Sequence, residues 1–334
     1  MNCIKEIIAS LTLILMSSCS MMHDDMSDCR RELRVRFRYD MNMKFADAFD
    51  SSVSSVTLYA YDSSGRLAMQ KTEPAADIKA RGYMTLDNLA PADYTLIAWA
   101  EGEERHTDSY AYGTPTSESP SPEALDCRII RDSRYIDHDL TPLYHGLVAK
   151  ADLTMQGYGV KTVTVPLTKD TNVIRIVLQN ASGKRLDSDS FAFYVDDDNS
   201  WLAYDNSPLA DDSITYRPWS QYDGTVGSSA PAADEGTAVS AVVAETTVNR
   251  LFASKHPRLR VVNTTSGKTV FSVPLIDYAL LVKGNYNRSM SDQEYLDRQD
   301  EYNFVFFVDD NLNWLSASII VNSWRVVLNN TDLK

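Results

Sequence analysis

Short runs in which apolar and polar residues alternate recur along the chain, and they restrict it to a fold built from β-sheets. In the first run Leu33, Val35 and Phe37 alternate with arginines, so one face is apolar and the other charged. Turn-forming residues separate the runs, and this regular spacing favours β-sandwiches. The predicted strands are 33–39, 56–60, 94–99, 160–165, 173–178, 191–195, 246–251, 259–263, 270–275, 303–308 and 318–328.

One short helix is expected among these strands. Ser291 and Glu294 have the spacing of a capping box, and the helix should run to about Tyr302. The polar segment Lys169–Asn172 marks a boundary near residue 168. The chain is long enough for two domains of about 150 residues each. We therefore expect an all-β protein with two tandem β-sandwich domains, 30–168 and 169–334.

The N-terminus reads as an export signal. The apolar run 7–16 is about ten residues long, too short to cross a bilayer as a helix, which needs roughly 20. Ser17 and Ser18 precede Cys19, and this resembles the bacterial lipoprotein box, although Met16 stands where that box prefers Leu. We predict a signal peptide over 1–18, acylation of Cys19 and a tether over 19–29. The alternative is an ordinary signal peptide in which Cys19 is incidental.

The net charge limits which partners the protein can bind, and the cysteines suggest a disulfide. The net charge is −14, which argues against nucleic acid as a partner and leaves the acyl chains on Cys19 to hold the protein on outer-membrane lipid. Outside the cytoplasm paired thiols oxidise, so we predict a disulfide between Cys29 and Cys127. The alternative is two unpaired cysteines too far apart to bridge.

Motifs of known enzyme chemistry are absent from the sequence. It contains no nucleophile elbow, zinc-protease motif, P-loop or dinucleotide fingerprint, and His138 and His145 are expected to be exposed polar residues. The acidic runs 196–199 and 309–311 could hold Ca²⁺, but such residues are also typical of hairpin turns. We expect no catalytic residue, no metal site and no cofactor.

Several blocks of sequence, taken in their order along the chain, carry a resemblance to a known family. The blocks are Cys29 with 33–37, and 42–49, 89–99, 163–169, 249–251, 274–278, 293–302 and 319–324. They resemble the fimbrial anchor-subunit lipoproteins of Bacteroidales (FimB-like fimbrillin anchors). Two positions depart from the family pattern, because Ala92 and Ser323 stand where the family usually has glycine.

The resemblance implies two transthyretin-like domains and a non-enzymatic role at the base of a fimbria. Such an anchor attaches the filament to the outer membrane at the cell surface, limits its length and joins a stalk subunit by β-strand complementation. The C-terminal strand is the candidate donor, with Ile320, Trp324, Val326 and Leu328 on one face. Alternatively, this strand closes its own domain.

A second function stays open. A surface lipoprotein of this fold could bind a glycan or a host ligand through the loops of its sandwiches. Trp201, Trp219 or Trp314 would then offer a surface on which a sugar ring could stack.

Overall fold

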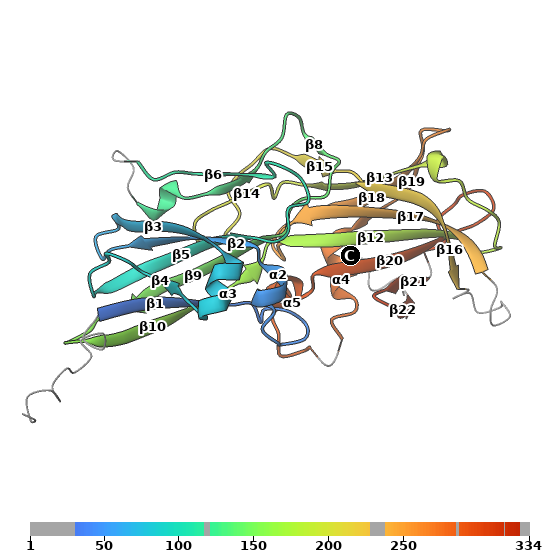
Figure 1. Cartoon of the computed structure of the whole chain (residues 1–334). Helices are drawn as coiled ribbons and strands as arrows, with labels where there is room; N and C mark the ends of the chain where they lie inside the picture. Colours follow the sequence, from blue (N-terminus) through green and yellow to red (C-terminus); the bar gives the residue numbers. More distant parts are fainter. Residues whose placement is uncertain (1–30, 117–120, 228–237, 285–286, 317, 328–334) are drawn as a thin grey trace, which may run out of the picture.

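The computed structural model describes residues 31–116, 121–227, 238–284, 287–316 and 318–327. Figure 1 shows an elongated molecule with the N-terminal strands at one end and the C-terminal strands at the other. The strands are β1 (Arg31–Arg38), β2 (Ser55–Tyr61), β3 (Leu67–Pro74), β4 (Met84–Thr85), β5 (Asp93–Glu101), β6 (Tyr110–Tyr112), β7 (Cys127–Ile129), β8 (Tyr135–Ile136), β9 (Leu143–Asp152), β10 (Gly159–Pro166), β11 (Thr168–Lys169), β12 (Thr171–Asn180), β13 (Phe191–Asp197), β14 (Trp201–Leu202), β15 (Ile214–Tyr216), β16 (Ser220–Gly227), β17 (Ala238–Asn249), β18 (Arg258–Asn263), β19 (Thr269–Pro274), β20 (Glu301–Val308), β21 (Ser318–Val321) and β22 (Trp324–Val327).

These strands confirm the all-β sandwich fold. Within the described residues their sheet orders are β10-β1-β4, β11-β9-β5-β2-β3, β14-β7-β6, β16-β17-β12-β20-β21-β22 and β19-β18-β13-β15-β8. The last two sheets enclose one part of the larger core, in which Phe304 and Phe306 of β20 lie with Phe193 of β13 and Val261 of β18.

The five-stranded sheet that contains β2 and β5 is buried on both faces. Leu58 and Leu96 face a core shared with β1, whereas Tyr59 and Trp99 face the side covered by β6 and β7. This explains why the segment 94–100 is almost continuously apolar instead of alternating. The N-terminal half therefore has three layers of sheet.

Two pairs of short strands connect the parts of the chain on either side of the predicted boundary at residue 168. From the N-terminal side, β7 pairs with β14 and β8 pairs with β15. The two-domain division stays a prediction, and any such division has to separate these pairs.

Four short α-helices are present in the described residues, where the sequence led us to expect one. They are α2 (Phe49–Ser52), α3 (Ala75–Arg81), α4 (Leu275–Leu280) and α5 (Asp292–Arg298), with 3₁₀ turns at η2 (Pro122–Ala124) and η3 (Ser188–Ser190). None of the helices in this part of the chain is long and apolar enough to cross a membrane.

The predicted helix is α5, and its start is confirmed. The Ser291 side chain accepts a hydrogen bond from the backbone N–H of Glu294. Its predicted end was wrong, because α5 stops at Arg298 and β20 begins at Glu301. Tyr302 pairs with Ile174 of β12 and is fully buried, so this residue belongs to the sheet and not to the helix.

The segment that joins the two halves is buried. The backbone N–H of Leu167 donates a hydrogen bond to the carbonyl of Arg38, and that of Asp170 donates to the carbonyl of Leu143, each at 2.7 Å. Asp170, Thr171 and Asn172 are at most 4 % exposed. The polar composition that predicted a boundary here therefore comes largely from buried side chains. A single residue, Asp170, separates β11 from β12.

Buried polar groups hold this segment against the C-terminal half. The Asn206 amide donates to Asp170 at 2.8 Å, and the Arg250 guanidinium lies 3.8 Å from the same carboxylate. Arg250 also forms a two-pronged pair with Asp297 of α5 at 2.8 and 2.7 Å. Burial raises the pKa of Asp170 to about 7, although Arg250 and Asn206 both lower it.

A second set of contacts joins α5 to the loop that follows β1. The Tyr39 hydroxyl donates to Asp300 at 2.9 Å. Arg298 donates to the carbonyl of Asp40 at 2.9 Å and lies over the Phe45 ring, 4.4 Å from its centroid. Two blocks of the family resemblance, 42–49 and 293–302, are thus packed against each other.

The single C-terminal strand predicted over 318–328 was wrong, because the segment is a hairpin. β21 and β22 pair antiparallel, with Val321 opposite Trp324. The two residues between them, Asn322 and Ser323, both have positive φ, 48° and 70°. This is the pattern of a type I′ turn, in which glycine is favoured at the second position. Ser323 therefore stands at a position where the turn favours glycine.

We expect Ser323→Gly to stabilise the protein by about 0.5–1 kcal/mol, because glycine removes the steric cost of left-handed backbone. Urea unfolding of the full chain measures the change. Ser323→Ala is the control and should bring no gain, since it keeps the Cβ atom. An equal or lower midpoint for the glycine variant would contradict the turn assignment.

The raised pKa of Asp170 makes a pH-dependent prediction. The unfolded carboxyl titrates near 3.9 and the folded one near 7, so wild-type stability falls as the pH rises between these values. Asp170→Asn removes the proton uptake, and its stability relative to wild type should increase by roughly 2–3 kcal/mol between pH 5 and pH 8.

Urea unfolding at both pH values measures this difference. Asp212→Asn, at an exposed aspartate, is the control and should give the same difference from wild type at both pH values. If Asp170→Asn behaved like this control, Asp170 would be ionised in the folded protein throughout the range.

Candidate assembly surfaces

The C-terminal hairpin forms one edge of the six-stranded sheet. β21 pairs with β20 through Val321 and Ile320, which lie opposite Phe304 and Val305. Asn322 strengthens this junction, because its backbone N–H donates to the carbonyl of Asn303 and its side chain accepts from the Asn303 N–H, each at 2.8 Å.

The two strands of the hairpin differ in their relation to the core. Ile319 and Val321 of β21 are fully buried in the larger core, whereas Ile320 is only partly buried. In the described residues β22 pairs with β21 alone. Of the predicted donor residues, Ile320 lies on β21, Trp324 and Val326 lie on β22, and Leu328 lies outside the described residues. β21 is therefore a core strand, and β22 is the outermost strand of the sheet.

The cysteine predictions stay untested. Cys19 and Cys29 lie outside the described residues. Cys127 lies on β7, in one outer layer of the N-terminal half, and its side chain is fully buried. Burial raises the pKa of its thiol well above the usual value.

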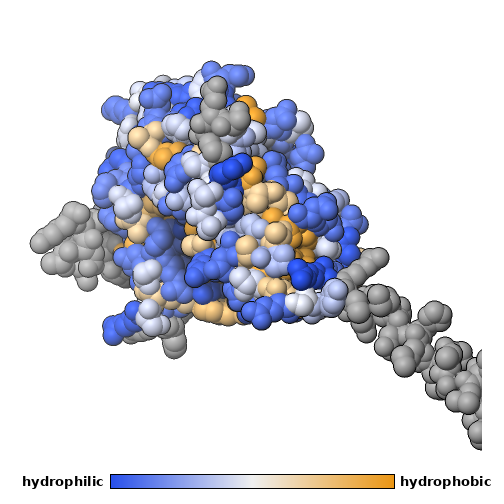
Figure 2. Space-filling view, turned by 90° about the vertical axis from the view of Figure 1, so that its left-hand side faces the viewer, coloured by the Kyte–Doolittle hydropathy of each residue, from blue (hydrophilic) through white to orange (hydrophobic). Residues whose placement is uncertain are grey.

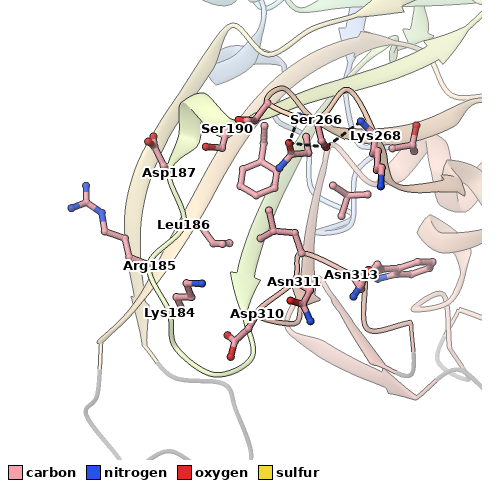
Figure 3. Close-up of a pocket in the computed structure, with 17 residues that line it drawn as sticks. Lys184, Arg185, Leu186, Asp187, Ser190, Ser266, Lys268, Asp310, Asn311 and Asn313 are labelled. Carbon is pink, nitrogen blue, oxygen red and sulfur yellow. Dashed lines mark hydrogen bonds between the residues drawn. The ribbon is translucent and has the colours of Figure 1, made fainter.

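A cleft of about 840 Å³ lies at the end of the C-terminal half that is farthest from β11. Three loops form it, one between β12 and β13, one between β18 and β19 and one after β20. Figure 3 shows that Lys184 and Leu186 point into the cleft, whereas Arg185 and Asp187 point away from it. Asn311, Asn313 and Trp314 line its opposite side.

The predicted tryptophan surface is divided among separate places. Only Trp314 lines this cleft, and its ring packs 5.3 Å from Phe271 at the rim of the core. Trp201 lies on β14 beneath the Arg128 guanidinium at 3.8 Å. Trp219 precedes β16 and is 39 % exposed. Any sugar that stacked in the cleft would therefore meet one tryptophan.

The acidic runs are engaged with neighbouring protein groups. Asp196 pairs with Arg260 at 3.1 Å, and Asp198 pairs with Lys255 at 2.8 Å. The Asp309 carboxylate accepts hydrogen bonds from the backbone of Asn311 and Asn313, each at 2.8 Å. This is the turn chemistry that competes with Ca²⁺ binding. No group of three His, Cys, Asp or Glu side chains within the described ranges is arranged to hold a metal.

The expectation that His145 is exposed was wrong. Its side chain is almost fully buried, and its Nε2 lies 2.9 Å from the carbonyl oxygen of Tyr204. Burial lowers the pKa of this imidazole to about 4. His138 is partly buried and stacks on His106, with 3.7 Å between the ring centroids. Neither the alternation of apolar and polar residues nor any turn motif in the sequence indicated the surroundings of His138 and His145.

Comparison with known proteins identifies relatives of the whole fold. A candidate adhesin from Bacteroides thetaiotaomicron is 31% identical, covers 90% of this chain and 99% of its own, and superposes with a TM-score of 0.78. A candidate polysaccharide-binding protein from the same species is 29% identical over 91% of this chain and all of its own, with a TM-score of 0.76.

The fimbrial anchor protein Mfa2 from Porphyromonas gingivalis shares the fold. It is 16% identical, covers 90% of this chain and 100% of its own, and has a TM-score of 0.67. No curated protein is similar enough to match. The sequence profile of the fimbrillin-A associated anchor proteins Mfa1 and Mfa2, which are not enzymes, matches residues 26–330. The chain therefore belongs to the family of fimbrillin-A associated anchor proteins.

Proposed function

We propose that this protein is the lipid-anchored base of a fimbria. Family membership makes it a fimbrial protein of the cell surface that associates with other fimbrial subunits. The proposal adds that acylated Cys19 anchors it in the outer membrane, that it attaches the filament there and limits filament length, and that it joins the stalk by β-strand complementation.

The separation of the tether from the open sheet edge is the observation that supports this proposal. The described chain begins at Arg31 on the outer end of the N-terminal half, and β21 and β22 lie in the other half (Figure 1). A membrane attached through Cys19 would therefore leave the C-terminal sheet free. The buried junction between the halves would keep this separation fixed.

Strand complementation has a physical basis in the hairpin. An outermost strand has one row of backbone N–H and C=O groups with no partner in its own sheet. Another chain can add a strand to that row, with backbone hydrogen bonds for affinity and alternate side chains for specificity. β22 is such a strand, and it can act as the donated strand or as the edge that accepts one. β21 would stay behind, because its apolar side chains belong to the core.

A limit on filament length follows from the same arrangement. A stalk subunit needs two connecting surfaces to continue a filament. A subunit with one end committed to the membrane has one connecting surface left, so it terminates growth at the base.

Two truncations test the role of β22. A chain that ends at Ser323 should fold and lose binding to the stalk subunit. A chain that ends at Ser318 should unfold, because loss of Ile319 and Val321 removes roughly 4 kcal/mol or more of core stability. Circular dichroism and a pull-down with the purified stalk subunit measure both.

Each truncation is the control for the other. Unfolding of the longer truncation would make β22 a core element, and binding by a folded longer truncation would place the stalk connection elsewhere.

Replacement of the proposed lipid site tests anchoring. In cells that carry Cys19→Ala we expect filaments in the medium instead of on the surface, because the protein would lose its acyl chains. Electron microscopy of cells and of the supernatant measures this. Cys29→Ala keeps the residues around the lipid site and should leave the filaments attached. Filaments that stayed on Cys19→Ala cells would disprove anchoring through this residue.

A further inference from the structure

An apolar tip lies where β9 turns into β10. Tyr158 is 69% exposed, and Val160, the second residue of β10, is 53% exposed. Gly157 and Gly159 flank Tyr158, and both have a positive φ, a backbone conformation that glycine adopts without steric cost. The tip therefore presents its apolar side chains to the surroundings and not to the core.

The N-terminal tether leaves the folded body beside this tip. Arg31, the first described residue, pairs with Gly159 in the parallel ladder of β1 and β10. Its guanidinium Nε donates to the carbonyl of Gly157 at 2.8 Å. The point at which the tether begins and the position of Tyr158 are thus fixed relative to each other.

The tether is short enough to hold this end of the molecule near a bilayer. Residues 20–30 separate Cys19 from Arg31. Such a segment spans at most about 40 Å when fully extended, and as a random coil its ends are about 20 Å apart on average. If Cys19 carries lipid, the tip spends its time within that distance of the membrane surface.

Aspartates of the folded body at this end are partly neutralised. Although the whole chain carries −14 and the tether contains Asp24, Asp25 and Asp28, two aspartates of the folded body here are paired with lysines. Asp152 lies 2.7 Å from Lys161, and Asp93 lies 3.4 Å from Lys150. Arg31 adds an exposed positive charge. Figure 2 faces this end of the molecule and shows apolar groups among polar ones on its surface.

A neighbouring loop extends the apolar surface. The backbone N–H of Leu153 donates to the carbonyl of Ala92 at 3.2 Å, which brings the loop before β5 next to the one before β10. In that loop Ala90 is exposed and Leu89 is partly buried.

We propose that the tip Gly157–Val160, with the loop at 89–92 beside it, contacts the lipid surface of the membrane that anchors Cys19. This inference rests on the proposed anchoring. Tyrosine suits the role, because its ring is apolar and its hydroxyl can remain among hydrated headgroups. Two exposed side chains are too few to bind a membrane unaided, so contact depends on the local concentration that the tether provides. The consequence is a fixed orientation, with the C-terminal half pointing away from the bilayer.

Photo-crosslinking on vesicles tests the contact. The chain from residue 20 to 334, with a histidine tag in place of Cys19, is bound to vesicles of phosphatidylethanolamine and phosphatidylglycerol that contain a nickel-chelating lipid. p-Benzoylphenylalanine replaces Tyr158 in one variant. In control variants it replaces Phe45, which is 55% exposed, or Tyr222, which is 40% exposed. Mass spectrometry detects the lipid adducts.

We expect at least a tenfold higher yield of lipid adducts at position 158 than at either control position. Equal yields would overturn the proposal, and adducts between two copies of the chain at position 158 would show that a second copy covers the tip. The double variant Tyr158→Ser with Val160→Ser should fold like the wild type and lose its preferred orientation on the vesicle surface. A protease should then cleave the two halves of the bound protein at equal rates. The nickel lipid replaces native acylation, so failure here is separate from failure of Cys19→Ala.

Discussion

The structure depends on the buried passage from β11 to β12. Two residues of β11 complete the sheet of the N-terminal half by pairing with Tyr144 and His145, and β12 begins after a single intervening residue, Asp170. A connection this short, with the backbone N–H groups of Leu167 and Asp170 both hydrogen-bonded, cannot act as a hinge, because a change in its backbone angles would break these bonds. The direction of the C-terminal half is therefore set by the end of the N-terminal half.

The polar groups around this passage give it specificity more than stability. Arg250 is largely buried, and the removal of its charge from water is costly unless every donor finds a partner. Asp297 supplies a two-pronged carboxylate, and the carbonyl of Asn206 accepts the remaining prong at 2.6 Å. An apolar interface could be as stable, but it could also slide. Fixed donor and acceptor geometry therefore defines one arrangement of the two halves.

Period-two alternation was enough to predict strands such as β1 and β20, because one face of each strand lies in a core. It missed the long strands β3, β9 and β16, and it also missed the shortest strands. β7, β8 and β14 are two or three residues long, too short to show an alternating pattern. The strand pairing across residue 168 could therefore not be predicted from the sequence. Asn322 and Ser323 continue an apparent strand, because neither is glycine, and only the ladder shows that they form a turn. The segment at 169–172 has the composition of a linker, and no local pattern distinguishes a solvated polar residue from a buried one with partners.

The path of mechanical load follows from these constraints. Tension on a fimbria that is anchored through Cys19 would enter the folded body at Arg31 and act along β1. Eight residues of β1 pair in parallel with β10, so the load is shared by the whole ladder and does not separate one pair at a time. It would then pass through the buried junction into β12, which lies between β17 and β20 at the centre of the second sheet. From β20 it would reach β21 and the edge strand β22. Within the folded body this route follows paired strands and the buried junction, so a filament attached at β22, as proposed, would pull on strand ladders and not on a solvated linker.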